Sequence, residues 1–75
     1  MDKTVGFIGF GHIATAVAKG LIRTRSVRKT NVFAFDTDAG KLKENAKEVG
    51  VSPVSSLGEL VKSSDFIVVA VTAKA

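Results

Sequence analysis

Two features of this sequence have the residue types and spacing to contact a polar ligand. The first is a glycine pattern, Gly9-Phe-Gly-His-Ile-Ala14, which follows a short apolar run and leads directly into a helical pattern. The second is a carboxylate, Asp36, at the end of the next apolar run. No Ser, Thr, Asp or Asn precedes the helix as a cap. Its first N–H groups and the positive end of its dipole are therefore free to bind a phosphate.

The small residues of this glycine turn (residues 9–14) have separate roles. Gly9 can leave a strand with dihedral angles that a Cβ would disfavour, and Gly11 lets a ligand approach the backbone closely. Ala14 completes a Gly-x-Gly-x-x-Gly/Ala pattern and lets the helix lie against the strand. The pattern alone is a weak signal, but a strand before it, a helix after it and the acidic Asp36 are the context of a dinucleotide site.

Asp36 bears on the choice of dinucleotide. Its carboxylate can accept hydrogen bonds from ribose hydroxyls, and it would repel a 2′-phosphate about 5 Å away by about 3 kcal/mol at an effective dielectric of about 20. Neither Thr37 nor Asp38 offsets this charge. We therefore predict NAD or NADP as the cofactor, with NAD slightly favoured. The alternative is that Asp36 only caps the following helix.

Two side chains in the glycine turn invite a role of their own. His12 is the only histidine, but no carboxylate in the local sequence is placed to orient it as a base, so we expect a structural or phosphate-neighbouring role. Phe10 is the phenylalanine that we expect to flank the cofactor. We predict no catalytic residue and no metal site in this chain.

The elements that must position these residues alternate as β-α-β-α-β-α-β. The alternation predicts a parallel sheet with helices on both faces, and Pro53 confines the third strand to an edge. The spatial order is then 3-2-1-4, a partial Rossmann-like, doubly wound α/β fold. The predicted strands are 4–8, 31–35, 51–54 and 66–71. Asp38 and Gly50 bound the second helix, and a capping box at Ser56 begins the third.

One face of the first helix is predicted to pack on the sheet. Its apolar stripe is formed by Ile13, Ala16, Val17, Gly20 and Leu21. A glycine inside a helix costs about 1 kcal/mol relative to alanine, so we expect Gly20 to allow close packing against a neighbouring element.

The last predicted strand, 66–71, has the apolar composition of a central strand, yet the order places it at an edge. An uncovered apolar edge invites pairing with another chain. We interpret residues 1–75 as a single dinucleotide-binding domain that is either truncated or completes its sheet by self-association through this strand.

Composition limits the other possibilities. The 75 residues allow one small domain, and the absence of cysteine fits a cytoplasmic protein. No run approaches the roughly 18 apolar residues of a membrane span. The net charge of +4 gathers at the end of the first helix, where cations offset the helix dipole, and no aromatic residues interleave with it. We expect neither nucleic acid nor a membrane as a partner.

The run from Val5 to Ile22 resembles the amino-terminal segment of pyrroline-5-carboxylate reductase, whose pattern is G-F-I-G-x-G-N-M-A followed by A-x-x-x-G-L. The likeness continues through Asp36, Lys41-Leu42 and residues 65–71, and so covers almost the whole chain. It implies reduction of a cyclic imine, pyrroline-5-carboxylate, to proline with hydride from NAD(P)H. It also implies a helical carboxy-terminal domain for oligomerisation and much of the substrate site, so we expect this chain alone to be inactive.

By position, the resemblance implies that the pyrophosphate contacts Phe10, Gly11, His12, Ile13 and Ala14. It implies ribose contacts at Asp36 and Thr37, and contacts on the nicotinamide side at Ala70, Val71 and Thr72. Two departures stand out: His12 replaces the usual Asn, and Thr72-Ala73 replaces Lys-Pro. The alternative function is a structural or self-associating module of this fold without a bound dinucleotide.

Overall fold

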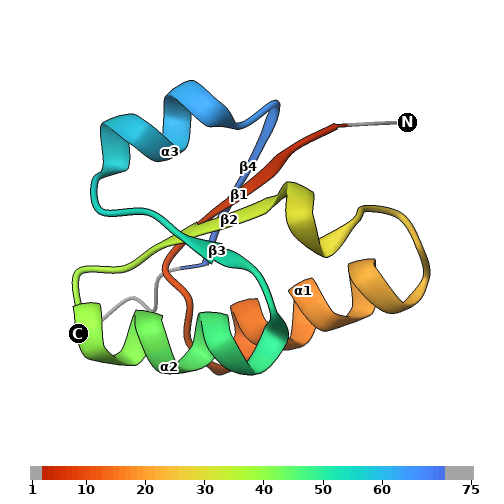
Figure 1. The fold of residues 1–75 in the computed structure, drawn as a ribbon, viewed down its shortest axis with the longest axis horizontal. Helices are drawn as coiled ribbons and strands as arrows, with labels where there is room; N and C mark the ends of the chain where they lie inside the picture. Colours follow the sequence, from red (N-terminus) through yellow and green to blue (C-terminus); the bar gives the residue numbers. More distant parts are fainter. Residues whose placement is uncertain (1–2, 71–75) are drawn as a thin grey trace.

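A parallel sheet with helices on both faces forms the framework of the protein (Figure 1). The computed structural model describes residues 3–70. The four strands lie in the order β3-β2-β1-β4, and every neighbouring pair is parallel, which confirms the predicted order. Their bounds are β1 (Val5–Ile8), β2 (Val32–Phe35), β3 (Ser52–Pro53) and β4 (Phe66–Val69).

Within residues 3–70, three α-helices connect the strands, with a single 3₁₀ turn before β2. Figure 1 shows α1 and α2 together on one side of the sheet and α3 on the other. Their bounds are α1 (His12–Arg23), α2 (Ala39–Val49) and α3 (Leu57–Ser63), and the 3₁₀ turn is η1 (Lys29–Asn31).

The predicted caps of α2 and α3 are present, but the capping box of α3 is incomplete, because the Glu59 carboxylate accepts from the N–H of Ser55 and not from that of Ser56. The side chain of Asp38 accepts a hydrogen bond of 3.0 Å from the N–H of Lys41, and Gly50 ends α2 in the left-handed conformation with φ of 89°. The Ser56 hydroxyl accepts a hydrogen bond of 3.1 Å from the N–H of Glu59 at the start of α3. These local signals set the ends of α2 and the beginning of α3.

The larger core lies between the sheet and the α1–α2 layer. Phe7, Val32 and Ala34 from the strands are fully buried there, together with Ala18 of α1 and Ala46 of α2. Small side chains on the helices let them approach the sheet closely, and the burial of apolar area stabilises the layer.

The predicted apolar stripe of α1 is correct at Leu21, which packs against the core, but wrong at its amino-terminal end. Ile13 is 71% exposed and Val17 is 42% exposed, whereas Ala14 and Ala18 face the core. Both sets of residues have helical spacing, so periodicity alone does not decide between them. In the first half of α1 the short side chains of Ala14 and Ala18 face the core, and those of Ile13 and Val17 point away from it.

The close approach expected at Gly20 occurs instead at Gly6. A Cβ on Gly20 would meet no atom within 4 Å, so the close-packing interpretation is wrong. On Gly6 of β1, a Cβ would overlap the Oγ of Ser64 and lie 3.0 Å from the Cγ of Leu60. The absence of a side chain at Gly6 is therefore what lets α3 lie close to the sheet.

Strand β4 lies at the edge of the sheet within residues 3–70, although its composition is that of a central strand. Phe66 is 57% exposed and Val69 is 66% exposed. Asp65 ties the start of this strand to Thr4, because its carboxylate accepts hydrogen bonds from the backbone N–H and the hydroxyl of that residue. These bonds hold the pKa of Asp65 below its usual range. Among the described helices, none has the length and apolar character needed to cross a membrane.

Candidate functional site

The glycine turn and Asp36 meet because their strands are neighbours. Ile8 at the end of β1 is in register with Phe35 at the end of β2, so the chain leaves both strands at the same edge of the sheet. Gly9 turns away with φ of 88°, a conformation that side chains disfavour, and its N–H donates a 2.8 Å hydrogen bond to the carbonyl of Phe35. The two predicted binding segments are thus side by side.

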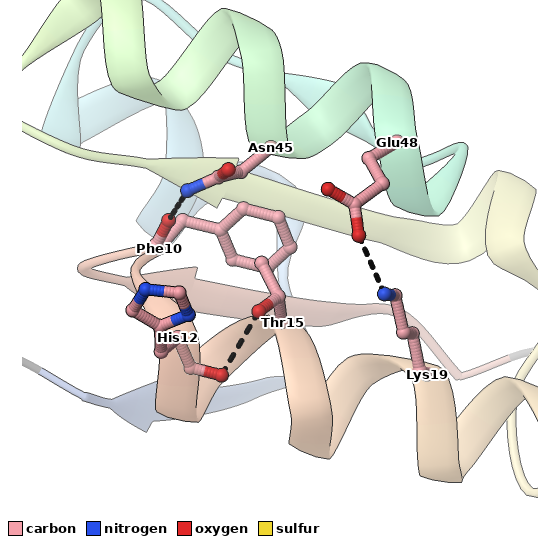
Figure 2. A network of polar contacts seen from close by, with 6 residues as sticks. All are labelled: Phe10, His12, Thr15, Lys19, Asn45 and Glu48. Atoms are coloured by element: carbon pink, nitrogen blue, oxygen red, sulfur yellow. Dashed lines mark hydrogen bonds and ion pairs between the residues drawn. The ribbon is translucent and has the colours of Figure 1, made fainter.

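The backbone of Phe10 is held from both sides by residues after β2. Its N–H donates to the Oδ2 of Asp36 at 2.8 Å. Its carbonyl accepts a hydrogen bond of 2.8 Å from the Nδ2 of Asn45 in the middle of α2, as Figure 2 shows. This Phe10 hydrogen-bond pair fixes the glycine turn against the segment that follows β2.

Asn45 was missed by the sequence reasoning. The available signal was its place in the helix, since it adjoins the buried Ala46 and lies three residues after the buried Leu42. An uncharged amide on that side of a helix is a candidate for a specific hydrogen bond. The pattern alone could not show that its partner would be the carbonyl of Phe10.

The ring of Phe10 does not flank the site. It is fully buried and packs edge-to-face against Phe7, with 5.6 Å between the ring centroids and an angle of 65° between the planes. Burial of a phenyl ring in this arrangement stabilises the core beneath the turn. The expectation that this ring lies beside the cofactor is therefore wrong, and Phe10 presents its backbone to the turn.

Asp36 is half-buried and uses both carboxylate oxygens. Besides the bond to Phe10, its Oδ1 accepts a 3.0 Å hydrogen bond from the N–H of Asp38. Partial burial raises the pKa of Asp36, but the N–H groups of Phe10 and Asp38, the charge of Lys41 and the N–H of Thr37 outweigh it, and the pKa lies below the usual 3.8. The cap of α2 is Asp38, so the interpretation of Asp36 as only a helix cap is wrong.

The start of α1 is open to an anion. Gly11 is its N-cap and supplies no capping hydrogen bond, and the first turn holds no acidic residue. His12 is exposed at this position, and its carbonyl accepts a bond from the Thr15 hydroxyl (Figure 2). Ala14 is buried against the core, which brings the helix start close to the sheet. The free N–H groups and the dipole together suit a phosphate.

The other residues predicted to contact the cofactor lie around the glycine turn, after β2 and at the end of β4. Ile13, within the glycine turn, and Thr37, after β2, are both exposed. Ala70 donates its N–H to the carbonyl of Ile8 at 2.8 Å, so the end of β4 also reaches this edge of the sheet. Val71 and Thr72 lie outside the described residues.

Lys41 is a further charged residue at the site that the sequence reasoning did not include. A Cβ on Gly11 would lie only 3.1 Å from the Nζ of Lys41. The ammonium group is therefore next to the start of α1, and its charge acts on Asp36. The site combines a helix N-terminus, one carboxylate and one ammonium group.

Residues 4–75 match the family described as NADP oxidoreductase, coenzyme F420-dependent. The chain belongs to this family. Among curated proteins, it is 34% identical over 67 residues to pyrroline-5-carboxylate reductase of Treponema pallidum, covering 89% of this chain and 26% of that protein. It is 28% identical over 71 residues to the reductase of the same name from Escherichia coli, covering 95% of this chain and 26% of that protein.

A solved structure agrees with the fold. The crystal structure of Plasmodium falciparum pyrroline carboxylate reductase with NADP bound matches with a TM-score of 0.73 and 29% identity, covering 92% of this chain and 24% of that one. The resemblance seen in the sequence is thus confirmed, as is the Rossmann-like α/β fold. The chain spans about a quarter of the length of the relatives that it matches.

Proposed function

We propose that this chain is the cofactor-binding portion of a pyrroline-5-carboxylate reductase-like oxidoreductase. The whole protein would transfer hydride from NAD(P)H to a cyclic imine in proline synthesis. The observation that carries the proposal is the uncapped start of α1, held beside Asp36 at the common edge of β1 and β2. A dinucleotide site in a doubly wound sheet has this arrangement. The named relatives and the NADP-bound neighbour support it.

In this proposal the glycine turn binds the pyrophosphate through backbone N–H groups, and residues after β2 bind the adenosine ribose. Asp36 can still accept a ribose hydroxyl, because each carboxylate oxygen accepts one hydrogen bond here and has capacity for a second. The end of β4 lies toward the nicotinamide. The proposed contacts are Gly9, Phe10, Gly11, His12, Ile13, Ala14, Asp36, Thr37, Ala70, Val71 and Thr72.

A slight preference for NAD(H) over NADP(H) follows from the negative charge of Asp36. The ammonium group of Lys41 opposes that preference, because it would attract the same 2′-phosphate that the carboxylate repels. We therefore expect both cofactors to bind. The difference between their affinities should be smaller than the charge of Asp36 alone would produce.

Equilibrium titration of the 75-residue chain with NADH and NADPH tests this function. We expect binding of both without proline formation when pyrroline-5-carboxylate is added. Absence of any fluorescence or heat change with either cofactor would favour a structural module without a bound dinucleotide. Steady proline formation would contradict the proposed inactivity of the isolated chain.

A second proposal concerns self-association through β4. The exposed apolar side chains of this strand, Phe66, Ile67 and Val69, lie at an edge whose backbone groups can pair with another strand. Sedimentation should then show an average mass that rises with protein concentration. Val69→Lys should lower that mass at a given protein concentration. A mass that is monomeric and independent of concentration would contradict self-association.

We also propose a cytoplasmic location. The sequence contains no cysteine, which suits a reducing compartment where disulfides do not form. Fractionation of the source cells, with the protein detected by antibody, tests this location. Recovery outside the cytoplasmic fraction would contradict it.

A further inference from the structure

Lys41 lies in the first turn of α2 and reaches toward the start of α1. Its backbone N–H is fixed by the Asp38 cap at 3.0 Å. The Nζ and Cε atoms lie 3.1 and 3.4 Å from the place where a Cβ on Gly11 would stand. The lysine side chain thus occupies space that is open because residue 11 is glycine. It stands next to the uncapped N–H groups at which a phosphate would bind.

The charge of Lys41 has no direct partner among residues 3–70. The one ion pair in that range joins Lys19 of α1 to Glu48 of α2, at 2.6 Å, and lies farther along both helices (Figure 2). Lys41 acts on Asp36 through its charge, but the two carboxylate oxygens bond to the N–H groups of Phe10 and Asp38. The ammonium group thus acts on Asp36 without a direct hydrogen bond to it, and its own donors are open to a ligand.

A phosphate at this place would meet two kinds of positive potential. The start of α1 offers oriented N–H groups, and an ammonium group adds a full charge with three donors. Charge-assisted hydrogen bonds of this kind are about twice as strong as neutral ones. Asp36 by itself would repel the same phosphate, so an adjacent cation is what makes the site tolerant of a dianion.

We propose that Lys41, whose ammonium group lies beside Gly11, contacts a phosphate group of the dinucleotide bound at this site. The proposal rests on the proposed function. Its ligand is either the pyrophosphate, which NADH and NADPH share, or the 2′-phosphate, which only NADPH carries. The two sources have the same chemistry, and the choice of cofactor in the experiment separates them.

The test is titration of the full chain with NADH and with NADPH, at about 0.05 M and about 0.5 M salt. Lys41→Gln removes the charge, Lys41→Arg keeps it, and Lys43→Gln is the matched control on an exposed position of the same helix. We expect Lys41→Gln to weaken binding about tenfold at the lower salt concentration. The difference in affinity between wild type and Lys41→Gln should be smaller at the higher salt concentration, because salt screens the charge of the lysine. Lys41→Arg should restore most of the affinity.

Each outcome decides the proposal. If Lys41→Gln weakens the binding of both NADH and NADPH, Lys41 contacts the pyrophosphate. If it weakens the binding of NADPH alone, Lys41 contacts the 2′-phosphate. Unchanged affinity for both, or equal weakening by Lys43→Gln, would overturn the role of Lys41 while the site itself stands. If the wild-type chain binds neither cofactor, the proposed function fails and the role of Lys41 falls with it. Thermal unfolding of each variant shows that a loss of binding is not a loss of fold.

Discussion

The carboxylate of Asp36 accepts a 2.8 Å hydrogen bond from the backbone N–H of Phe10, which joins the loop after β2 to the turn after β1. The residue expected to bind the ribose therefore also holds the turn expected to bind the pyrophosphate. Because one side chain serves both segments, changes at Asp36 should alter the stability of the turn as well as cofactor affinity.

Asp36→Asn should lower the free energy of unfolding by about 1–2 kcal/mol at pH 7. Asparagine has one oxygen, so its NH₂ group would face either the N–H of Phe10 or that of Asp38. Urea unfolding followed by circular dichroism measures the difference. Asp38→Asn is the control, since asparagine is as good a helix cap as aspartate. Equal stability of Asp36→Asn and wild type would contradict the structural role of this carboxylate.

The contribution of Asp36 should depend on pH in a defined window. Its pKa in the folded protein lies below the usual 3.8, so its stabilisation is fully present above that value and is lost as the pH falls through the lower, folded-state pKa. The difference in stability between wild type and Asp36→Asn should therefore be constant between about pH 5 and 7 and shrink below about pH 4. Asp65, whose pKa is also lowered, titrates in both proteins and cancels in the difference. A difference that grows in acid would contradict the lowered pKa.

Asn45→Asp should destabilise the protein by about 1–2 kcal/mol and weaken dinucleotide binding. The substitution keeps the size and helix propensity of the side chain but removes the donor, and places a carboxylate oxygen against the carbonyl of Phe10. Urea unfolding and NADH titration measure the two effects. Glu44→Gln, on an adjacent exposed position, should change neither. A variant with wild-type stability would show that the bond does not fix the turn.

The features that local sequence determines were predictable. The alternation of strand and helix, with Pro53 at an edge, led to the observed strand order. Asp38, Gly50 and Ser56 mark helix ends through bonds to residues at most four positions away, so short-range patterns contain the signal. The juxtaposition of Asp36 and the glycine turn follows from the parallel order of β1 and β2.

The features that depend on packing between distant segments were not predictable in this way. Helical spacing on α1 fits two faces, and the observed one is chosen by how closely Ala14 and Ala18 can approach the sheet. The ring of Phe10 was expected beside the cofactor, but its burial depends on the position of Phe7 beneath the turn. Asn45 and Lys41 reach the site only because α2 packs beside α1, which no local pattern specifies.

The two glycines of β1 and α1 should respond to alanine in opposite directions. Gly20→Ala should raise the free energy of unfolding by about 0.5–1 kcal/mol, because a Cβ there meets no atom within 4 Å and alanine favours the helix. Gly6→Ala should lower it by about 1–3 kcal/mol, because its Cβ would overlap the Oγ of Ser64 and press on Leu60. Urea unfolding of both variants measures the pair.

The cause of the Gly6→Ala effect can be isolated with a second substitution at Ser64. Its hydroxyl donates a 2.6 Å hydrogen bond to the carbonyl of Leu60, which places the Oγ against β1. A Cβ on Gly6 would meet the Oγ and Cβ of Ser64 and the Cγ of Leu60. Ser64→Gly removes the first two of these atoms and leaves the third. Gly6→Ala should therefore cost less in the Ser64→Gly background than in wild type, since the two residues are in contact and their effects do not add. Equal costs in both backgrounds would mean that α3 is not held close to β1 through this contact.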